Sequence, residues 1–147
     1  MRKFLLAAAL AAATLGAGAV MPAQTAQAQV GTAIPAAGLT GDWAGGYVSA
    51  DGADVNTFTV KLRQAGGTIS GTIYETNVFG DQSRALFLTS TFAGTIANRQ
   101  VRFTKTYDGS GGVSHSVVYT GALEPNGRRI RGTFNAGGAA GTFEMVR

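Results

Sequence analysis

One short pattern recurs six times in this chain and restricts the folds open to it. It consists of an apolar residue, any residue, a glycine, any residue, and usually a second, bulky apolar residue. In a strand, side chains two positions apart point to the same face, so each glycine shares a face with its apolar neighbours. Repeated inward glycines weaken flat strands, but they suit the tight bending of a closing barrel. The six are Gly45, Gly71, Gly94, Gly121, Gly132 and Gly141.

Apolar and polar residues alternate almost without pause from Gly41 onward, as in Phe58, Val60 and Leu62 with their polar neighbours. Period-two alternation predicts strands, and short turn-forming connections favour antiparallel neighbours. We therefore predict an all-β fold, an eight-stranded antiparallel up-and-down (meander) barrel, because closure removes the exposed strand edges. A β-sandwich is the alternative, since it has similar strands and turns. The predicted strands are 43–50, 55–64, 68–76, 85–96, 100–107, 114–123, 128–135 and 140–147.

The first 28 residues have the three parts of a secretory signal peptide. Arg2 and Lys3 form a positive start, residues 4–20 are almost entirely apolar, and Ala26-Gln27-Ala28 offers small residues at the cleavage site. The sequence thus predicts a secreted or periplasmic protein, with residues 1–28 removed. Residues 29–40 form a flexible leader without periodicity, and residues 41–147 form the barrel. The strands are not expected to span a membrane, because Thr68, Ser70 and Thr72 would face lipid.

Charge and cysteine content exclude several function classes. The chain has twelve Lys and Arg against eight Asp and Glu, and export removes two basic residues, so the net charge falls from +4 to about +2. No nucleic-acid partner is expected, and Arg128, Arg129 and Arg131 are interpreted as a solvated outer face. The absence of cysteine excludes disulfides, thiolate metal sites and cysteine nucleophiles.

The two ends of the predicted barrel differ. If the first strand runs upward, the lower connections are short, whereas the upper ones include the longer segments 77–84 and 108–113. Five of the six pattern glycines lie toward the lower end, where close approach of strands narrows a barrel. A closed lower end and an open, loop-lined upper end is the geometry of a small ligand-binding cup.

Gly41-Asp42-Trp43 opens the first strand, and Arg147 ends the last strand at the same lower end. In this respect the chain resembles the calycin group, which comprises lipocalins, avidins and bacterial metalloprotease inhibitors of the same barrel type. The resemblance implies that Trp43 is buried with the Arg147 side chain packed across its ring. It also implies that a ligand would be held inside the barrel.

Four ionisable or polar residues fall on inward positions near the upper end: Glu75, Lys105, Tyr107 and His115. Because buried ionisable groups are costly unless paired or wet, we expect them to converge on the mouth as a polar cap over a ligand. Lys105 would then favour an anionic or carbonyl-bearing group. The alternatives are a solvated rim, or an internal Glu75–Lys105 pair that seals the cup. The apolar wall beneath is predicted to consist of Phe103, Tyr119 and Ile73.

Catalytic chemistry is not expected. The chain has one histidine, and no carboxylates lie at metal-ligand spacing around it. Ser114 and His115 are adjacent in a strand, so their side chains diverge and cannot form a catalytic pair. We predict a non-catalytic protein without cofactor or metal that binds a small, partly apolar molecule. The alternative is a protein-interaction module, such as a protease inhibitor that uses the leader or the upper loops.

Overall fold

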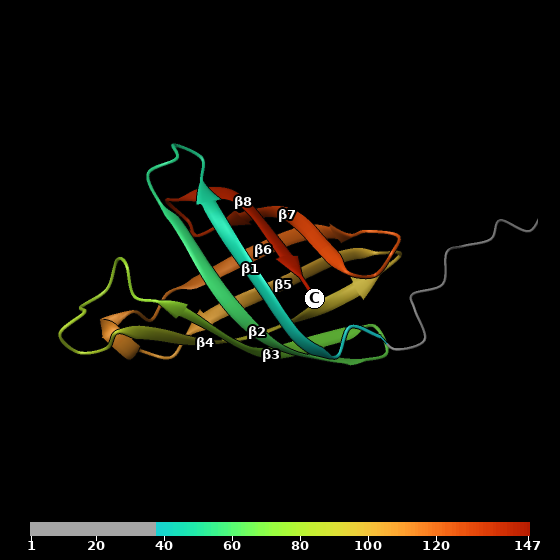
Figure 1. The fold of residues 1–147 in the computed structure, drawn as a ribbon, viewed down its shortest axis with the longest axis horizontal. Helices are drawn as coiled ribbons and strands as arrows, with labels where there is room; N and C mark the ends of the chain where they lie inside the picture. Colours follow the sequence, from blue (N-terminus) through green and yellow to red (C-terminus); the bar gives the residue numbers. More distant parts are fainter. Residues whose placement is uncertain (1–37) are drawn as a thin grey trace, which may run out of the picture. The chain divides into compact units, whose positions relative to one another are not determined.

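A computed structural model describes residues 38–147, and these form a closed barrel in which each strand pairs with the next and β8 pairs with β1 (Figure 1). The predicted eight-stranded antiparallel meander barrel is therefore confirmed. The signal peptide and most of the leader lie outside the described residues. The strands are β1 (Gly41–Ser49), β2 (Val55–Ala65), β3 (Thr68–Thr76), β4 (Phe87–Ala97), β5 (Gln100–Tyr107), β6 (Ser116–Leu123), β7 (Arg129–Asn135) and β8 (Ala140–Val146).

Strand boundaries match the sequence prediction to within two residues at each end. The largest differences are of two residues, at the starts of β1, β4 and β6, which begin at Gly41, Phe87 and Ser116 rather than at 43, 85 and 114. β4 and β6 follow long upper connections, where turn geometry rather than alternation decides the start. The connection before β6 contains a 3₁₀ turn, η1 (Ser110–Gly112), next to Gly109 with φ of 96°.

The barrel interior is filled with apolar side chains from every strand. In β2 the alternation is complete, with Asn56, Phe58, Val60 and Leu62 buried and the residues between them exposed. Burial of such side chains is the main driving force for the fold, at about 25 cal/mol for each Å² of apolar surface removed from water.

Most of the pattern glycines lie opposite phenylalanines. Five of the six pair across strands with a phenylalanine, and the sixth, Gly121, pairs with Gly132. The lack of a side chain lets the neighbouring strand or ring come close: a Cβ on Gly71 would lie 1.9 Å from the Lys61 carbonyl oxygen. Phenylalanine rings thus occupy the middle of the barrel. The pairs are Gly45–Phe58, Gly71–Phe92, Gly94–Phe103, Gly132–Phe143 and Gly141–Phe134.

The lower end is closed by Leu39 and Trp43, which are 0% and 2% exposed. The indole Nε1 of Trp43 donates a hydrogen bond of 2.9 Å to the Leu39 carbonyl oxygen. The guanidinium carbon of Arg147 lies 5.2 Å from the centroid of the Trp43 ring, which is the contact expected from the sequence. A buried aromatic ring with a cation on its face closes this end without a long loop.

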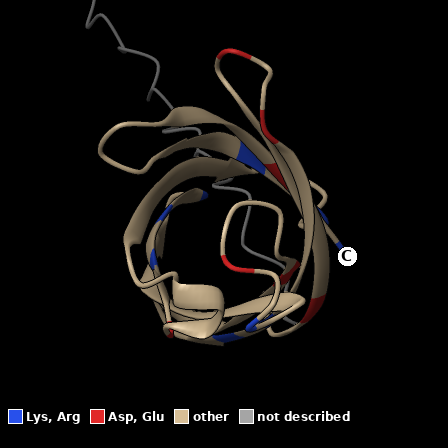
Figure 2. Cartoon of the chain, turned by 90° about the vertical axis from the view of Figure 1, so that its left-hand side faces the viewer, with Lys and Arg blue, Asp and Glu red and all other residues tan. Residues whose placement is uncertain are grey.

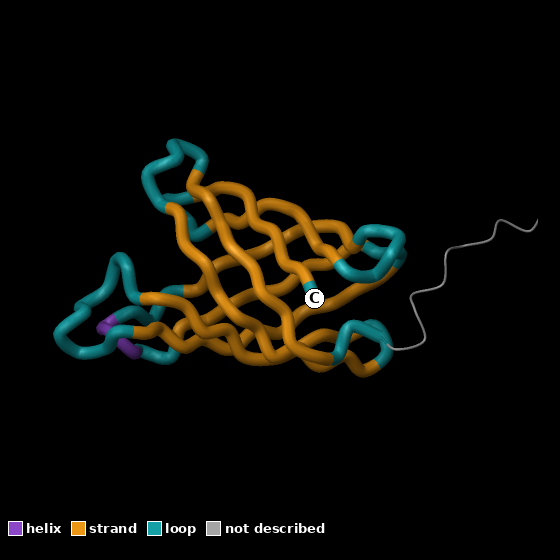
Figure 3. Tube along the Cα trace, viewed as in Figure 1, coloured by secondary structure: helices purple, strands orange, loops and turns teal. Residues whose placement is uncertain are grey.

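Longer connections surround the upper end: residues 50–54, 77–86, 108–115 and 136–139. Figure 2 looks along the barrel from this end and shows a ring of strands with loops over the opening, and Figure 3 separates these loops from the strands. By contrast, the lower turns after β2 and β4 have two residues each. Asn98 and Arg99 form one of them with φ of 49° and 64°, as in the tight turns that join twisted strands. Among residues 38–147, no helix is long and apolar enough to cross a membrane.

Candidate functional site

Three of the predicted site residues form one buried hydrogen-bonded network in the upper half of the barrel. Lys105 Nζ donates to Glu75 Oε1 and lies within hydrogen-bond distance of the Tyr107 hydroxyl oxygen, both at 2.8 Å. The Tyr107 hydroxyl in turn donates to Glu75 Oε1. Strand parity explains the arrangement, because Lys105 and Tyr107 are two residues apart on β5 and Glu75 faces inward on β3. Lys105 is 0% and Glu75 2% exposed.

This burial decides what the network can do. Desolvation lowers the pKa of the Lys105 ammonium, and the adjacent Glu75 carboxylate partly offsets that effect. Desolvation, followed by the hydrogen bond to Glu75, raises the pKa of the Tyr107 hydroxyl. The second carboxylate oxygen, Glu75 Oε2, is buried and has no hydrogen-bond partner among the described residues. The charge of Lys105 is therefore used inside the protein to balance Glu75.

A cavity of about 190 Å³ opens at the upper end, and we call it the upper cavity. Its wall is mainly aromatic, and the ring pairs Tyr47–Phe134 and Phe79–Tyr107 meet edge to face with centroids 5.4 and 5.9 Å apart. Such pairs hold their rings in fixed orientations. The lining residues are Tyr47, Ser49, Asp54, Phe79, Tyr107, His115, Val117, Tyr119, Phe134, Ala136 and Ala139.

The structure divides the seven candidate ligand-binding residues into two groups. Tyr107, His115 and Tyr119 line the upper cavity, with the His115 ring 4.9 Å from that of Tyr107. The other four do not line it, so the predicted convergence on the mouth is found only in part. Glu75 and Lys105 belong to the buried network, and Ile73 and Phe103 are core residues at 2% and 3% exposure.

Sequence reasoning missed several residues of the cavity wall. Tyr47 and Phe134 lie at inward positions of β1 and β7, so their parity could have identified them. Asp54 and Phe79 come from the connections 50–54 and 77–86, where no periodicity indicates which side chain turns inward.

The connection 77–86 is ordered by hydrogen bonds that hold Phe79 near the mouth. The Asn77 side chain donates to the Ala85 carbonyl oxygen at 2.8 Å and accepts from the Gly80 N–H at 2.7 Å. The Asp81 N–H donates to the carbonyl oxygen of Gly111 at 2.8 Å, which ties this connection to η1. Phe79 is 44% exposed, and it forms the outer part of the cavity wall.

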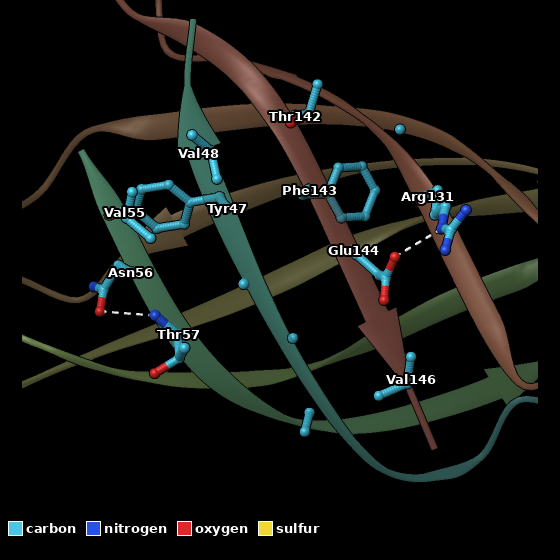
Figure 4. Close-up of a pocket in the computed structure, with 14 residues that line it drawn as sticks. Tyr47, Val48, Val55, Asn56, Thr57, Arg131, Thr142, Phe143, Glu144 and Val146 are labelled. Atoms are coloured by element: carbon cyan, nitrogen blue, oxygen red, sulfur yellow. Dashed lines mark hydrogen bonds and ion pairs between the residues drawn. The ribbon is translucent and has the colours of Figure 1, made fainter. Parts of the chain in front are cut away.

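A larger hollow lies on the outer surface across β1, β2, β7 and β8, with a volume of about 690 Å³ (Figure 4). Gly45, Gly46 and Gly132 are among the residues that line it. Its two charged side chains are engaged with each other, since Arg131 Nε lies 2.7 Å from Glu144 Oε2. The upper cavity is the better candidate site, because it combines aromatic walls with the side chains of Asp54 and His115, which make no hydrogen bond to another described residue.

The upper cavity is suited to holding a molecule by apolar contact. Burial, followed by the negative charge of Glu75, raises the pKa of Tyr47 from 10.0 to about 12, so its hydroxyl stays neutral even above pH 10. Burial likewise raises the pKa of Tyr119. Among the described residues, no group of three or more His, Cys, Asp or Glu side chains could hold a metal ion. A wall of neutral rings with a few polar groups can bind and orient a small ligand.

Comparison with known proteins gives a structural similarity. No protein-family model matches the chain, and no curated protein matches it. A solved structure described as a redesigned beta barrel superposes with a TM-score of 0.60 and 15% sequence identity. The match covers 74% of this chain and 90% of the designed one. At this level of identity the similarity concerns the fold, a closed eight-stranded antiparallel β-barrel.

Proposed function

We propose that this chain is a non-catalytic binding protein that holds one small, largely apolar molecule in the upper cavity. The observation that carries the proposal is the aromatic-lined volume of about 190 Å³ at the open end. A cavity of about 150 Å³ lined by apolar side chains can bind benzene. The ligand is therefore expected to be no larger than a substituted ring, because phenylalanine rings fill the barrel below.

In this proposal the two layers of the upper barrel have different roles. The rings of Tyr47, Tyr119 and Phe134 supply affinity through buried area, while His115 orients the ligand. The network of Glu75, Lys105 and Tyr107 lies next to this wall and holds the Tyr107 ring in place. A buried hydrogen-bond network makes a rigid support, which lowers the ordering cost of binding.

The proposal includes export and a calycin-like origin. The signal-peptide pattern of residues 1–28 supports a secreted or periplasmic location. The contact of Arg147 with the ring of Trp43 supports the calycin resemblance. A ligand site at the open end of the barrel is consistent with export and with the calycin resemblance.

Binding can be tested by NMR titration with indole and benzyl alcohol, two neutral probes of suitable size. Ala136→Trp should fill the upper cavity, because Ala136 lines it and is partly buried. Ala122→Trp is the matched control, since Ala122 is exposed on the outer face of β6. We expect binding to the wild type and to the control, and loss in Ala136→Trp. If neither indole nor benzyl alcohol binds to the wild type, the proposal is rejected.

A protein-interaction module is the second candidate, and one surface observation favours it. The seven exposed large apolar side chains of the described region all lie on β1 to β4 or on the connection 77–86, toward the upper end. Exposed apolar clusters mark interaction sites. Inhibition of secreted proteases by the wild type, with loss in Leu86→Ser/Phe87→Ser, would favour this candidate. The seven are Val48, Val55, Tyr74, Val78, Phe79, Leu86 and Phe87.

A further inference from the structure

We infer that the upper cavity selects a small organic cation, an alkylated ammonium of about the size of choline, through its aromatic wall and the Asp54 carboxylate. This inference rests on the proposed function and adds the charge and chemical class of the ligand. It differs from the expectation drawn from sequence, in which Lys105 favoured an anionic group.

The aromatic wall is the first observation. Five aromatic side chains line the cavity, and adjoining rings such as Tyr119 and Phe134 have centroids 5.9 Å apart. The face of an aromatic ring carries partial negative charge, and several rings around one space attract a desolvated cation. An alkylated ammonium suits such a wall, because its methyl groups make apolar contacts and need no hydrogen-bond acceptors. The five are Tyr47, Phe79, Tyr107, Tyr119 and Phe134.

The second observation is the sign of the fixed charges. Asp54 lines the cavity, and its carboxylate makes no ion pair with any residue in 38–147. The positive charge of Lys105 is balanced by Glu75, whose second oxygen, Oε2, has no partner among the described residues. The Glu75–Lys105 ion pair has no net charge, so Asp54 sets the sign of the field in the cavity, and its negative charge contributes to the raised pKa of Tyr47. An anion would enter against this field, whereas a cation is stabilised by it.

The loops around the opening carry mainly negative charge. Asp51, Asp81 and Asp108 lie in the upper connections together with Asp54, and the basic residue of these described connections is Arg84. Figure 2 shows the red acidic segments in the loops that face the viewer. Charges of one sign around an opening raise the local concentration of a ligand of opposite sign. The cavity and its approach therefore favour the same class of molecule.

The test compares choline with 3,3-dimethylbutan-1-ol, in which a neutral carbon replaces the ammonium nitrogen at the same shape. Calorimetric titration is run at about pH 8 and at low ionic strength, where attraction between charges is least screened. We expect choline to bind about tenfold more tightly than the alcohol. Asp54→Asn should weaken choline binding about fivefold and leave the affinity for the alcohol unchanged. Asp42→Asn is the matched control, because Asp42 is exposed on β1 near the lower end.

The outcomes separate this inference from the proposed function. If the alcohol binds as tightly as choline, or indole binds and choline does not, the cation inference is overturned while the cavity remains a ligand site. Equal effects of Asp54→Asn and Asp42→Asn would overturn the role given to Asp54. Failure of choline, the alcohol and indole alike would reject both the inference and the proposed function.

Discussion

At the scale of single residues, the behaviour of Lys105 depends on its partner more than on its own charge. Its ammonium is fully buried beside the Glu75 carboxylate and the Tyr107 hydroxyl. Taking two charges out of water is costly, and their attraction repays that cost only when the geometry is good. Removing one partner leaves the other charge buried and uncompensated. A single substitution should therefore lower the free energy of unfolding far more than a double substitution that removes both charges.

The first prediction concerns this pair. Lys105→Met keeps the apolar stem and should lower the free energy of unfolding by about 3–5 kcal/mol, because Glu75 loses its counter-charge. The double variant Glu75→Gln/Lys105→Met should recover much of that loss. Urea unfolding followed by circular dichroism measures both.

An exposed ion pair provides the control for this experiment. Lys61 and Asp42 lie 3.0 Å apart, with side chains 71% and 81% exposed. Lys61→Met should change the free energy of unfolding by less than about 1 kcal/mol. If Lys105→Met is no more destabilising than Lys61→Met, the buried pair does not stabilise the barrel.

At the scale of strands, the glycines determine how closely neighbouring backbones approach. An added Cβ at Gly94 would lie 2.0 Å from the Arg102 carbonyl oxygen, and one at Gly132 would lie 2.0 Å from that of Thr120. Both contacts involve backbone of the adjoining strand, which cannot move without disturbing the ladder. The closure of the barrel thus depends on the absence of side chains at these glycines as much as on the phenylalanines that pack beside them.

The second prediction is that Gly71→Ala destabilises the barrel by about 2–3 kcal/mol, because the new methyl group would force β2 and β3 apart. Gly138→Ala is the matched control. Gly138 lies in the β7–β8 connection, and an added Cβ there would have no atom within 4 Å. Thermal unfolding should show no loss of stability in this variant, and a gain of a few tenths of a kcal/mol is expected. Equal stability of the two variants would contradict the role given to Gly71.

Strand-level patterns explain what could be predicted from the sequence and what could not. Alternation and the glycine pattern predicted the barrel, and the parity of Glu75, Lys105 and Tyr107 predicted their common side. Parity gives the face of a strand but not the depth of a side chain, so Lys105 was expected at the mouth, whereas it is found buried in the internal pair with Glu75 that was one of the alternatives. Asp54 and Phe79 were missed because the placement of loop side chains depends on contacts made after the strands have assembled.

At the scale of the whole molecule, charge is unevenly distributed between the two ends. The described residues of the lower half carry most of the arginines, including Arg128, Arg129 and Arg131, whereas the upper connections are mainly acidic. Some of the arginines are paired, as Arg129 and Arg131 are with Glu144. The protein therefore has a dipolar surface, and salt should affect ligand entry at the upper end more than it affects folding.

The third prediction is loss of stability in alkali. The pKa of Tyr47 is raised from 10.0 to about 12, so between these values the folded protein keeps a proton that the unfolded chain has released. The folded state then binds more protons, and the free energy of unfolding falls as the pH rises. The contribution of Tyr47 to the free energy of unfolding should be fully present below about pH 10 and should be lost toward pH 12. The raised pKa values of Tyr107 and Tyr119 act in the same direction.

The melting temperature measured from pH 8 to pH 12 tests this prediction. The lowered pKa of Lys105 has the opposite effect, but only below the ordinary lysine pKa of 10.5, above which the unfolded lysine is also neutral. Tyr47→Phe removes the ionisable group and keeps the ring, so it should make the alkaline decline less steep. A melting temperature unchanged up to pH 12 would contradict the burial of these hydroxyls.

The closed lower end has a spectroscopic consequence. Trp43 is the only tryptophan of the chain, and it is sealed under Leu39 at the end of the barrel opposite the upper cavity. Its fluorescence emission should therefore report whether the barrel is folded, and it should change very little when a ligand binds. The tyrosines of the cavity wall should respond instead, through their near-ultraviolet absorbance. Folding and occupancy can thus be followed in the same sample through two separate optical signals.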